Sequence, residues 1–161
     1  MCIRDRHYSG TRKHKENAYE ISCIFDKIFI NILQMNDQIQ AEFKKIFNGR
    51  FSTSESTRAN YARGEDTYDP VLSKAVVFPE TNEEVSKVLR LCNEHKIPVV
   101  PFGTGTSLEG NVVGNEKGIT ICLEKMNKIL SVNVEDFDCR VQACVTKEQL
   151  NDYLREDGVF F

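Results

Sequence analysis

The sequence has few histidines and no paired cysteine motif. Three histidines occur in 161 residues, and two of them, His7 and His14, lie in the first 34 residues. The six cysteines include no C-x-x-C pair, and most of them lie in apolar runs: Cys2, Cys23, Cys92, Cys122, Cys139 and Cys144. This pattern argues against a zinc site or a disulfide framework. We expect no metal site, and buried reduced thiols in a cytosolic protein.

The chain also lacks a strong charge imbalance and a long apolar run. Its net charge is −3 and its hydrophobic content 40%, which is typical of one globular domain or a piece of a larger one and gives no reason to expect nucleic acid as a partner. The apolar stretch at residues 22–33 is interrupted by Asp26 and Lys27, has no small-residue cleavage site, and is shorter than the roughly 20 residues that span a bilayer. We therefore expect no transmembrane segment.

Residues 1–34 differ from the rest of the chain. The first six residues resemble the translation of a sequencing adapter, so we interpret residues 1–34 as a non-native or upstream leader and Met35 as the start. Residues 35–69 are interpreted as an N-terminal helix and a polar connecting arm. The helix is capped by Asn36 and ended by Gly49. Its apolar positions recur at helical spacing: Ile39, Phe43, Ile46 and Phe47.

A glycine-rich stretch follows the apolar run at residues 97–100. Five of the nine glycines lie between Gly103 and Gly118, so backbone freedom is concentrated there. Glycine allows a ligand to approach the main chain, and consecutive N–H groups can form a concave nest for an anion. Thr104, Thr106 and Ser107 add hydroxyl donors, so a bound phosphate would be held by neutral groups.

Two common phosphate-binding motifs do not fit this stretch. A G-x-G-x-x-G fingerprint starting at Gly103 would need glycine where Leu108 stands. A G-x-x-x-x-G-K-[ST] loop starting at Gly105 would need lysine and Ser or Thr where Asn111 and Val112 stand. The stretch is therefore neither a dinucleotide fingerprint nor a Walker loop.

The residues before the glycines predict a βαβ unit. Residues 75–78 are a buried strand, Thr81 and Glu84 form a capping box, and residues 99–100 return to the sheet after Pro98. The helix between them has an apolar stripe: Val85, Val88, Leu89 and Cys92. The glycine loop therefore leaves the carboxyl end of a parallel strand, where open α/β sheets bind ligands.

The residues after the loop predict strands and one more helix. Apolar and polar residues alternate at 119–123, 130–134 and 141–145, which indicates strands. Thr146 with Gln149 forms a second capping box, and Gly158 ends that helix. Its apolar face is Leu150, Tyr153 and Leu154. Residues 159–161 are expected to begin another strand, so the domain is expected to continue beyond them.

Several segments together resemble a known family. The loop from Pro101 to Gly110 resembles the pyrophosphate loop of FAD-linked oxidases of the vanillyl-alcohol oxidase type. It is most similar to D-lactate dehydrogenases that pass electrons to cytochrome and to FAD-binding subunits of glycolate oxidase. Five further segments occur in the order that this family shows: residues 75–79, 98–101, 126–130, 135–137 and 145–150. The resemblance runs from about Phe51 to the last residue.

The resemblance implies a fold and a cofactor. The fold would be α+β with an α/β start, a p-cresol methylhydroxylase-type FAD-binding domain at residues 70–161. A small parallel βαβ subdomain would be followed by a mainly antiparallel one, truncated before the end of the domain and the substrate cap. The residues implied to bind FAD are Pro101, Phe102, Gly103, Thr104, Gly105, Thr106, Ser107 and Gly110. Val99, Val100 and Phe102 are expected to flank the cofactor.

The resemblance also bears on how the cofactor is attached and on the reaction. Relatives with covalent flavin carry histidine where Thr106 stands, so FAD would be noncovalent. The usual second glycine of the subfamily is replaced by Asn111, which tolerates left-handed conformations. No catalytic residue is expected in this chain. His95, in the last turn of a helix, is expected to be a surface residue.

The implied activity is oxidation of D-lactate to pyruvate, with electrons passed through FAD to cytochrome c or a quinone. Glycolate and 2-hydroxyglutarate are alternative substrates. The implied location is the bacterial cytoplasm, with peripheral attachment at the inner membrane, or the mitochondrion in a eukaryote. Two other interpretations stay open: a nonflavin module that binds nucleotide phosphates, and an ordinary α/β fold whose glycines only make a tight connection.

Overall fold

The computed structural model describes residues 37–161, which belong to one compact unit. The interpretation of residues 1–34 and the Asn36 cap lie outside the described residues. The helices are α2 (Asp37–Phe47), α3 (Glu55–Asn60), α4 (Asn82–Glu94) and α5 (Lys147–Leu154), with a 3-10 turn at Arg155–Asp157. The strands are β1 (Phe51–Ser52), β2 (Ala75–Val77), β3 (Val99–Phe102), β4 (Ile119–Cys122), β5 (Ile129–Asn133) and β6 (Asp138–Val141). Within residues 37–161, no helix is long and apolar enough to cross a membrane.

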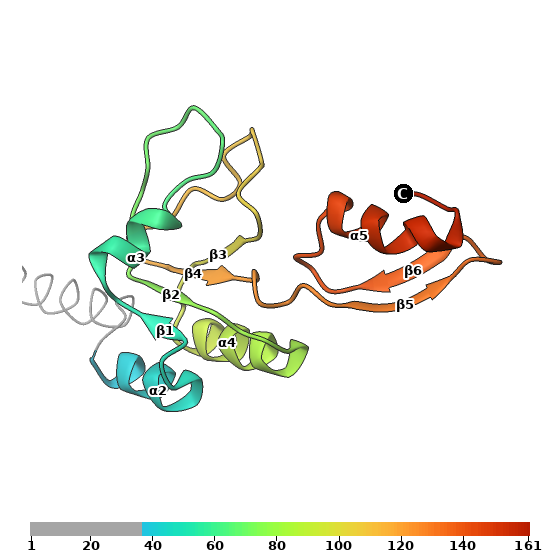
Figure 1. Ribbon diagram of the computed structural model, residues 1–161. Coiled ribbons are helices and arrows are strands. Elements are labelled where there is room, and N and C mark those ends of the chain that lie inside the picture. Colours follow the sequence, from blue (N-terminus) through green and yellow to red (C-terminus); the bar gives the residue numbers. More distant parts are fainter. Residues whose placement is uncertain (1–36) are drawn as a thin grey trace, which may run out of the picture. The chain divides into compact units, whose positions relative to one another are not determined.

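The first sheet has the strand order β1-β2-β4-β3 (Figure 1). Strands β2 and β3 both run parallel to β4, and β1 pairs antiparallel with β2. The predicted parallel βαβ unit is therefore confirmed, but its two strands are separated by β4, which comes later in the chain. All four residues of β4 are buried. The alternation at residues 119–123 therefore marks a central strand that is buried on both faces.

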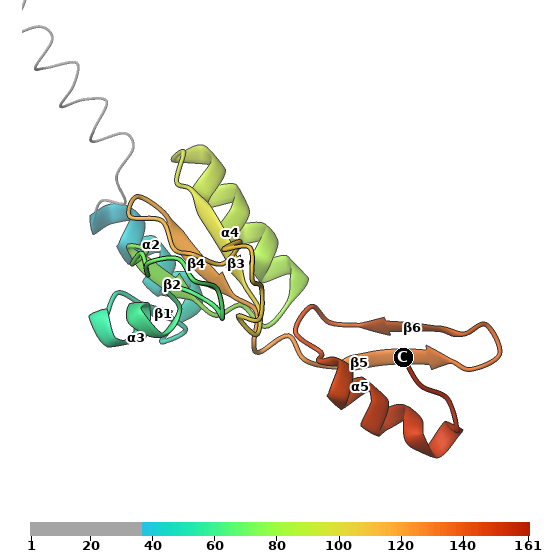
Figure 2. The ribbon, with the colours of Figure 1, turned by 90° about the horizontal axis from the view of Figure 1, so that it is seen from above.

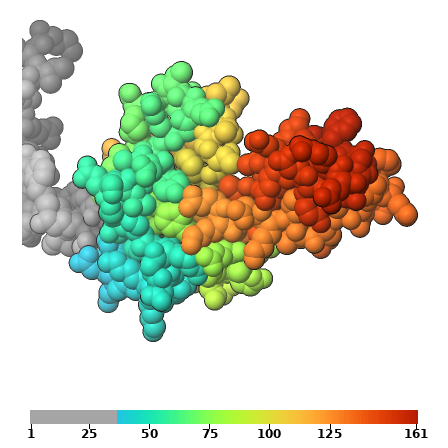
Figure 3. All heavy atoms as spheres, in the orientation of Figure 1, coloured from blue at the N-terminus to red at the C-terminus, as the bar shows by residue number. Residues whose placement is uncertain are grey.

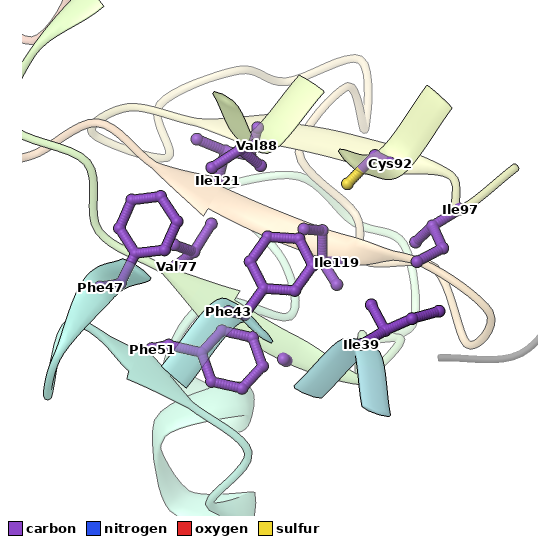
Figure 4. Close-up of a cluster of buried hydrophobic side chains, with 11 residues drawn as sticks. Ile39, Phe43, Phe47, Phe51, Val77, Val88, Cys92, Ile97, Ile119 and Ile121 are labelled. Carbon is purple, nitrogen blue, oxygen red and sulfur yellow. The ribbon is translucent and has the colours of Figure 1, made fainter. Parts of the chain in front are cut away.

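One face of this sheet is covered by α2 and α4 (Figure 4). The strands contribute alternate residues to the contact, because successive side chains of a strand point to opposite faces. These residues are Ala75, Val77, Ile119 and Ile121. Phe43 of α2 stacks on Phe47 and Phe51, with ring centroids 6.2 and 5.3 Å apart. The predicted helix at residues 37–47 is confirmed, and its apolar residues form the centre of the main core.

The opposite face is covered by a smaller cluster. Val76 and Cys122 point to this side and pack with Phe102 and Val112. Tyr61, which follows α3, packs on this cluster, with its ring edge-to-face against Phe102 at 5.2 Å. The segment at residues 52–70 therefore contributes a strand residue, a helix and part of the core to the first sheet.

Helix α4 differs from the prediction in its apolar stripe. Val88 and Cys92 are buried, but Leu89 is 47% exposed, and Leu91 packs against the core in its place. The Thr81 hydroxyl accepts a hydrogen bond from the Glu84 N–H at 3.3 Å, which is one half of the predicted capping box. The Glu84 carboxylate instead accepts from the Glu80 N–H and pairs with Arg50 at 2.5 Å. An ion pair with a distant arginine has replaced the second half of the box.

The second sheet is an antiparallel hairpin of β5 and β6. The strand predicted at residues 141–145 lies earlier in the structure, at β6, and Ala143 falls outside it. The Thr146 hydroxyl caps α5 by accepting from the Gln149 N–H, but the Gln149 side chain donates to the Asn127 carbonyl instead of closing a box.

The last residues also depart from the prediction. Leu150 and Leu154 of α5 are buried, whereas Tyr153 is exposed. Gly158 ends the helical segment with φ +70°, as predicted. Residues 159–161 form no strand, and the Phe161 main chain is instead held by two hydrogen bonds with the Asn151 side chain.

Candidate cofactor site

The glycine loop leaves the carboxyl end of β3 beside the end of β4, as predicted (Figure 2). Gly105 and Gly110 have φ values of +76° and +74°, in the left-handed region that residues other than glycine rarely adopt. At Gly103 a Cβ atom would meet nothing within 4 Å. The main chain at Gly103 is therefore open to an approaching ligand, while Gly105 and Gly110 set the turns of the loop.

The Phe102 side chain belongs to the core. It is 7% exposed, and a Cβ at Gly105 would lie 2.9 Å from its ring. Val99 packs against the main core under α2 and α4. The buried Phe102 ring therefore packs against the loop at Gly105. That Val99, Val100 and Phe102 flank a bound cofactor stays a prediction.

The hydroxyl groups of the loop are close to one another. The Thr104 and Thr106 hydroxyl oxygens are 3.3 Å apart, and both residues are exposed. The Ser107 hydroxyl donates to the Glu109 carboxylate at 3.3 Å, so the one acidic group of the loop already has a partner. One of these two hydroxyls donates to the other, which leaves one hydroxyl hydrogen to donate to a phosphate oxygen.

The segment after α3 lies directly against the loop (Figures 1 and 3). The Glu65 N–H donates to the Gly105 carbonyl at 2.8 Å, and a Cβ at Gly64 would lie 2.2 Å from the same oxygen. The buried carboxylate of Asp66 accepts from the Gly64 and Tyr68 N–H groups at 3.1 and 3.0 Å. Sequence reasoning missed this contact, although a glycine two residues before an aspartate in a polar, turn-rich segment is a signal for a tight turn.

Two clefts meet at Gly103 and Thr104. One is lined by Gly105 and by residues of the segment after α3, among them Arg63 and Glu65. The other runs between Thr106 and residues 143–148 at the start of α5. The loop therefore has open space on both sides, as a ligand held by its main chain would require. A third, apolar pocket lies between β5, β6 and residues 159–161, away from the loop.

Tyr61 and Glu124, which line the first cleft, are joined by a hydrogen bond, and the buried thiol of Cys122 lies nearby in the smaller core cluster. The Tyr61 hydroxyl donates to the Glu124 carboxylate at 3.0 Å, and burial together with this bond raises the pKa of Tyr61 well above its usual range. Burial raises the pKa of Cys122 to about 12. Both groups are protonated at neutral pH, so neither offers a proton acceptor to a substrate. Cys92, Cys122 and Cys144 are free and buried, as predicted, whereas Cys139 is free but partly exposed.

The donors of the loop fit a diphosphate. Open main chain at Gly103, followed by the left-handed Gly105 and Gly110 and accompanied by the hydroxyls of Thr104 and Thr106, suits phosphate oxygens. Within residues 37–161 no group of three His, Cys, Asp or Glu side chains could hold a metal ion. His95 lies at the end of α4, outside both clefts. These features are those expected of a loop that would hold a phosphate-containing cofactor.

The comparison with protein families gives the cofactor. Residues 73–161 match the model of an FAD-binding domain family, so the chain belongs to that family and its cofactor is FAD. Its fold is that of the p-cresol methylhydroxylase-type FAD-binding domains. It superimposes on alkyldihydroxyacetonephosphate synthase with a TM-score of 0.71 at 19% identity over 79% of this chain and 27% of that one. For p-cresol methylhydroxylase with substrate bound, the TM-score is 0.63 at 24% identity over 81% of this chain and 25% of that one.

Curated relatives are more similar in sequence. A probable mitochondrial D-lactate dehydrogenase of Danio rerio is 38% identical over 110 residues, which are 68% of this chain and 22% of the relative. A mitochondrial D-lactate dehydrogenase [cytochrome] of Arabidopsis thaliana is 33% identical over 130 residues, 80% of this chain and 23% of the relative. A D-2-hydroxyglutarate dehydrogenase of Haemophilus influenzae is 32% identical over 134 residues, which are 81% of this chain and 12% of the relative. The chain spans less than a quarter of the length of these three proteins.

Proposed function

We propose that the protein of which this chain is a part is an FAD-dependent 2-hydroxy-acid dehydrogenase that oxidises D-lactate to pyruvate. The observation that carries the proposal is the 38% identity with a probable D-lactate dehydrogenase over the segment that contains the glycine loop. Glycolate and D-2-hydroxyglutarate are the alternative substrates, since a glycolate oxidase subunit and D-2-hydroxyglutarate dehydrogenases are also similar to this chain.

The part of this chain in the reaction is to bind and orient the cofactor. Bound FAD supplies a two-electron acceptor for the hydride from C2 of the hydroxy acid. In our proposal the N–H groups of the loop and the hydroxyls of Thr104 and Thr106 hold its diphosphate without a covalent bond. The full set of proposed binding residues is Pro101, Phe102, Gly103, Thr104, Gly105, Thr106, Ser107 and Gly110.

The base that removes the hydroxyl proton and the groups that bind the substrate carboxylate are assigned to residues outside this chain. Cytochrome c or a quinone is the proposed electron acceptor. For a eukaryotic source the mitochondrion is the proposed location, because two of the similar D-lactate dehydrogenases are mitochondrial.

The substrate assignment is tested by anaerobic titration of the purified full-length protein. We expect D-lactate to bleach the flavin absorption and L-lactate to leave it unchanged. Glycolate and D-2-hydroxyglutarate are titrated in parallel. A protein that is bleached faster by one of these two acids than by D-lactate has the alternative substrate, and a protein bleached by none of the three is not a 2-hydroxy-acid dehydrogenase.

The loop assignment is tested at Gly103. Replacing Gly103 with valine adds a side chain where the structure has open space, so the fold is expected to survive while FAD is lost. The measurement is the ratio of flavin to protein after gel filtration, with the melting temperature as the check on folding. A folded Gly103→Val protein that retains the normal flavin ratio would show that the diphosphate lies elsewhere.

A further inference from the structure

Residues 62–66 are held against the glycine loop by main-chain contacts. The Glu65 N–H donates to the Gly105 carbonyl at 2.8 Å, and the Ala62 carbonyl accepts from the Gly114 N–H at 3.0 Å. Gly64 is so close to Gly105 that any side chain at position 64 would collide with it. These contacts join the segment to Gly105 within the loop and to Gly114 after it, so the main chain at Arg63 is held beside the loop.

Arg63 is one of the residues that line the first cleft. It is exposed, and it lines the cleft together with Gly103, Thr104 and Gly105. In the described part of the chain the Arg63 guanidinium has neither a hydrogen bond nor an ion pair. An arginine with five free donors therefore stands next to the open main chain of the loop.

The charges around this cleft favour an interaction with an anion. Its other charged lining residues are Glu65 and Glu124, and Glu124 accepts the hydrogen bond of Tyr61. Of the residues described, Arg63 is the one cation on this lining. The diphosphate of FAD carries two negative charges, whereas the donors of the loop are neutral. Without Arg63, the nearest charges to a diphosphate in this cleft would be repulsive.

We propose that Arg63 is the cationic partner of the FAD diphosphate and belongs to the cofactor site, although it lies before the family match at residues 73–161. A guanidinium suits phosphate oxygens because its planar donors bind two of them at once. The proposal rests on FAD as the cofactor of this domain and is independent of the substrate.

The test uses neighbouring charges of opposite sign in the full-length protein. We compare Arg63→Gln with Glu65→Gln; both side chains are exposed and have no partner among the described residues, so neither change disturbs a packed contact. FAD is removed, and its dissociation constant is measured by quenching of flavin fluorescence. Arg63→Gln is expected to weaken FAD binding about tenfold, and Glu65→Gln to tighten it about threefold because a repulsive charge is removed.

Salt and a distant arginine serve as controls. The difference between Arg63→Gln and the unmodified protein should shrink between about 20 mM and about 300 mM salt, because salt screens the interaction of exposed charges. Arg90→Gln, which removes an exposed arginine of α4 outside both clefts, should leave affinity within about twofold at either salt. Arg63→Lys should retain part of the affinity, since it keeps the charge but loses the planar donors.

Three results overturn the proposal. These are an Arg63→Gln protein with unchanged affinity, a loss of affinity that is the same at both salt concentrations, and a loss shared in sign by Arg63→Gln and Glu65→Gln. A loss caused by misfolding is recognised because Arg63→Lys would then fail to restore affinity and the melting temperature of the FAD-free protein would fall. A protein that binds FAD but oxidises none of the proposed acids defeats the proposed function and leaves this test intact.

Discussion

The first sheet and the hairpin of β5 and β6 are built from similar sequence patterns but differ in burial. Both contain alternating apolar and polar residues, yet all four residues of β4 are buried, whereas each residue of β5 and β6 is at least partly exposed. The first sheet has core clusters on both faces, whereas the hairpin has α5, with its buried Leu150 and Leu154, lying over it (Figure 1). Alternation therefore indicates a strand, while burial depends on the layers that other segments supply.

This difference predicts that removing an aromatic ring lowers the free energy of unfolding more in the first sheet's core than at the hairpin. Phe43→Ala is expected to lower the free energy of unfolding by about 3–5 kcal/mol, because the buried ring stacks on Phe47 and Phe51 and a cavity would remain. Phe137→Ala, at an 86% exposed position, is expected to change it by less than about 0.5 kcal/mol. Urea unfolding of the full-length protein measures both. Equal costs would mean that the hairpin is buried against a further part of the protein.

The contact between Gly64 and Gly105 predicts the next largest effect. Gly64→Ala places a methyl group 2.2 Å from the Gly105 carbonyl, so the segment must move off the loop. We expect a loss of about 2 kcal/mol in stability together with weaker FAD binding. Gly49→Ala is the control. Gly49 also lies outside the loop, but a Cβ added there would meet nothing within 4 Å. Because its φ is +87°, this variant measures the effect of backbone strain alone. Retention of normal FAD affinity by Gly64→Ala would show that the segment does not shape the site.

The ion pair of Arg50 and Glu84, which lies at the first sheet, predicts that the free energy of unfolding depends on pH. The Arg50 hydrogen bond lowers the pKa of Glu84 from 4.5 to about 2. Because the folded-state pKa is depressed, the pair stabilises the protein fully above pH 4.5, and this contribution is lost as the pH falls towards 2. Glu84→Gln should therefore cost about 1–3 kcal/mol at pH 7 and progressively less below pH 4.5.

The measurement is the free energy of unfolding against pH for both proteins. The two curves should converge at acid pH. Curves for Glu84→Gln that stay equally separated at all pH values would contradict the role of the charge.

The two helix caps provide the smallest and most direct comparison. Thr81 and Thr146 accept the same hydrogen bond, from the N–H three residues later, at 3.3 and 3.1 Å. Replacing either with alanine should cost about 1 kcal/mol. If the hairpin and α5 unfold together with the first sheet, both variants shift the single urea transition equally. If they unfold separately, Thr146→Ala shifts an early transition that Thr81→Ala leaves unchanged.

The sequence predicts most of the local elements of the first sheet. The spacing of Phe43 and Phe47, the cap at Thr81 and the break at Pro98 are local signals, and each has its expected outcome in the structure. The position of β4 between β2 and β3 depends on pairing between distant residues, which no local pattern encodes. The exposure of Leu89 and the burial of Leu91 likewise depend on where the helix rests on the sheet.

The candidate site was also predictable only where its residues give a local signal in the sequence. The glycines and hydroxyls of the loop stand out in the sequence, and the structure places them at the carboxyl end of β3. Gly64 and Arg63 are about forty residues earlier, in a polar segment without periodicity, and only the folded chain brings them to Gly105. The bounds of β6 differ from the prediction because the alternating apolar residues at 141–145 continue past the end of the strand.

The pairing of β1 with β2 has a practical consequence for recombinant work. A protein cut at residue 73, where the family match begins, would lack α2 and β1. The underside of the sheet, now shielded by Phe43, Phe47 and Phe51, would face water, and β2 would become an unprotected edge. Such a shortened version should collect in inclusion bodies, so cloning boundaries are better set upstream of α2.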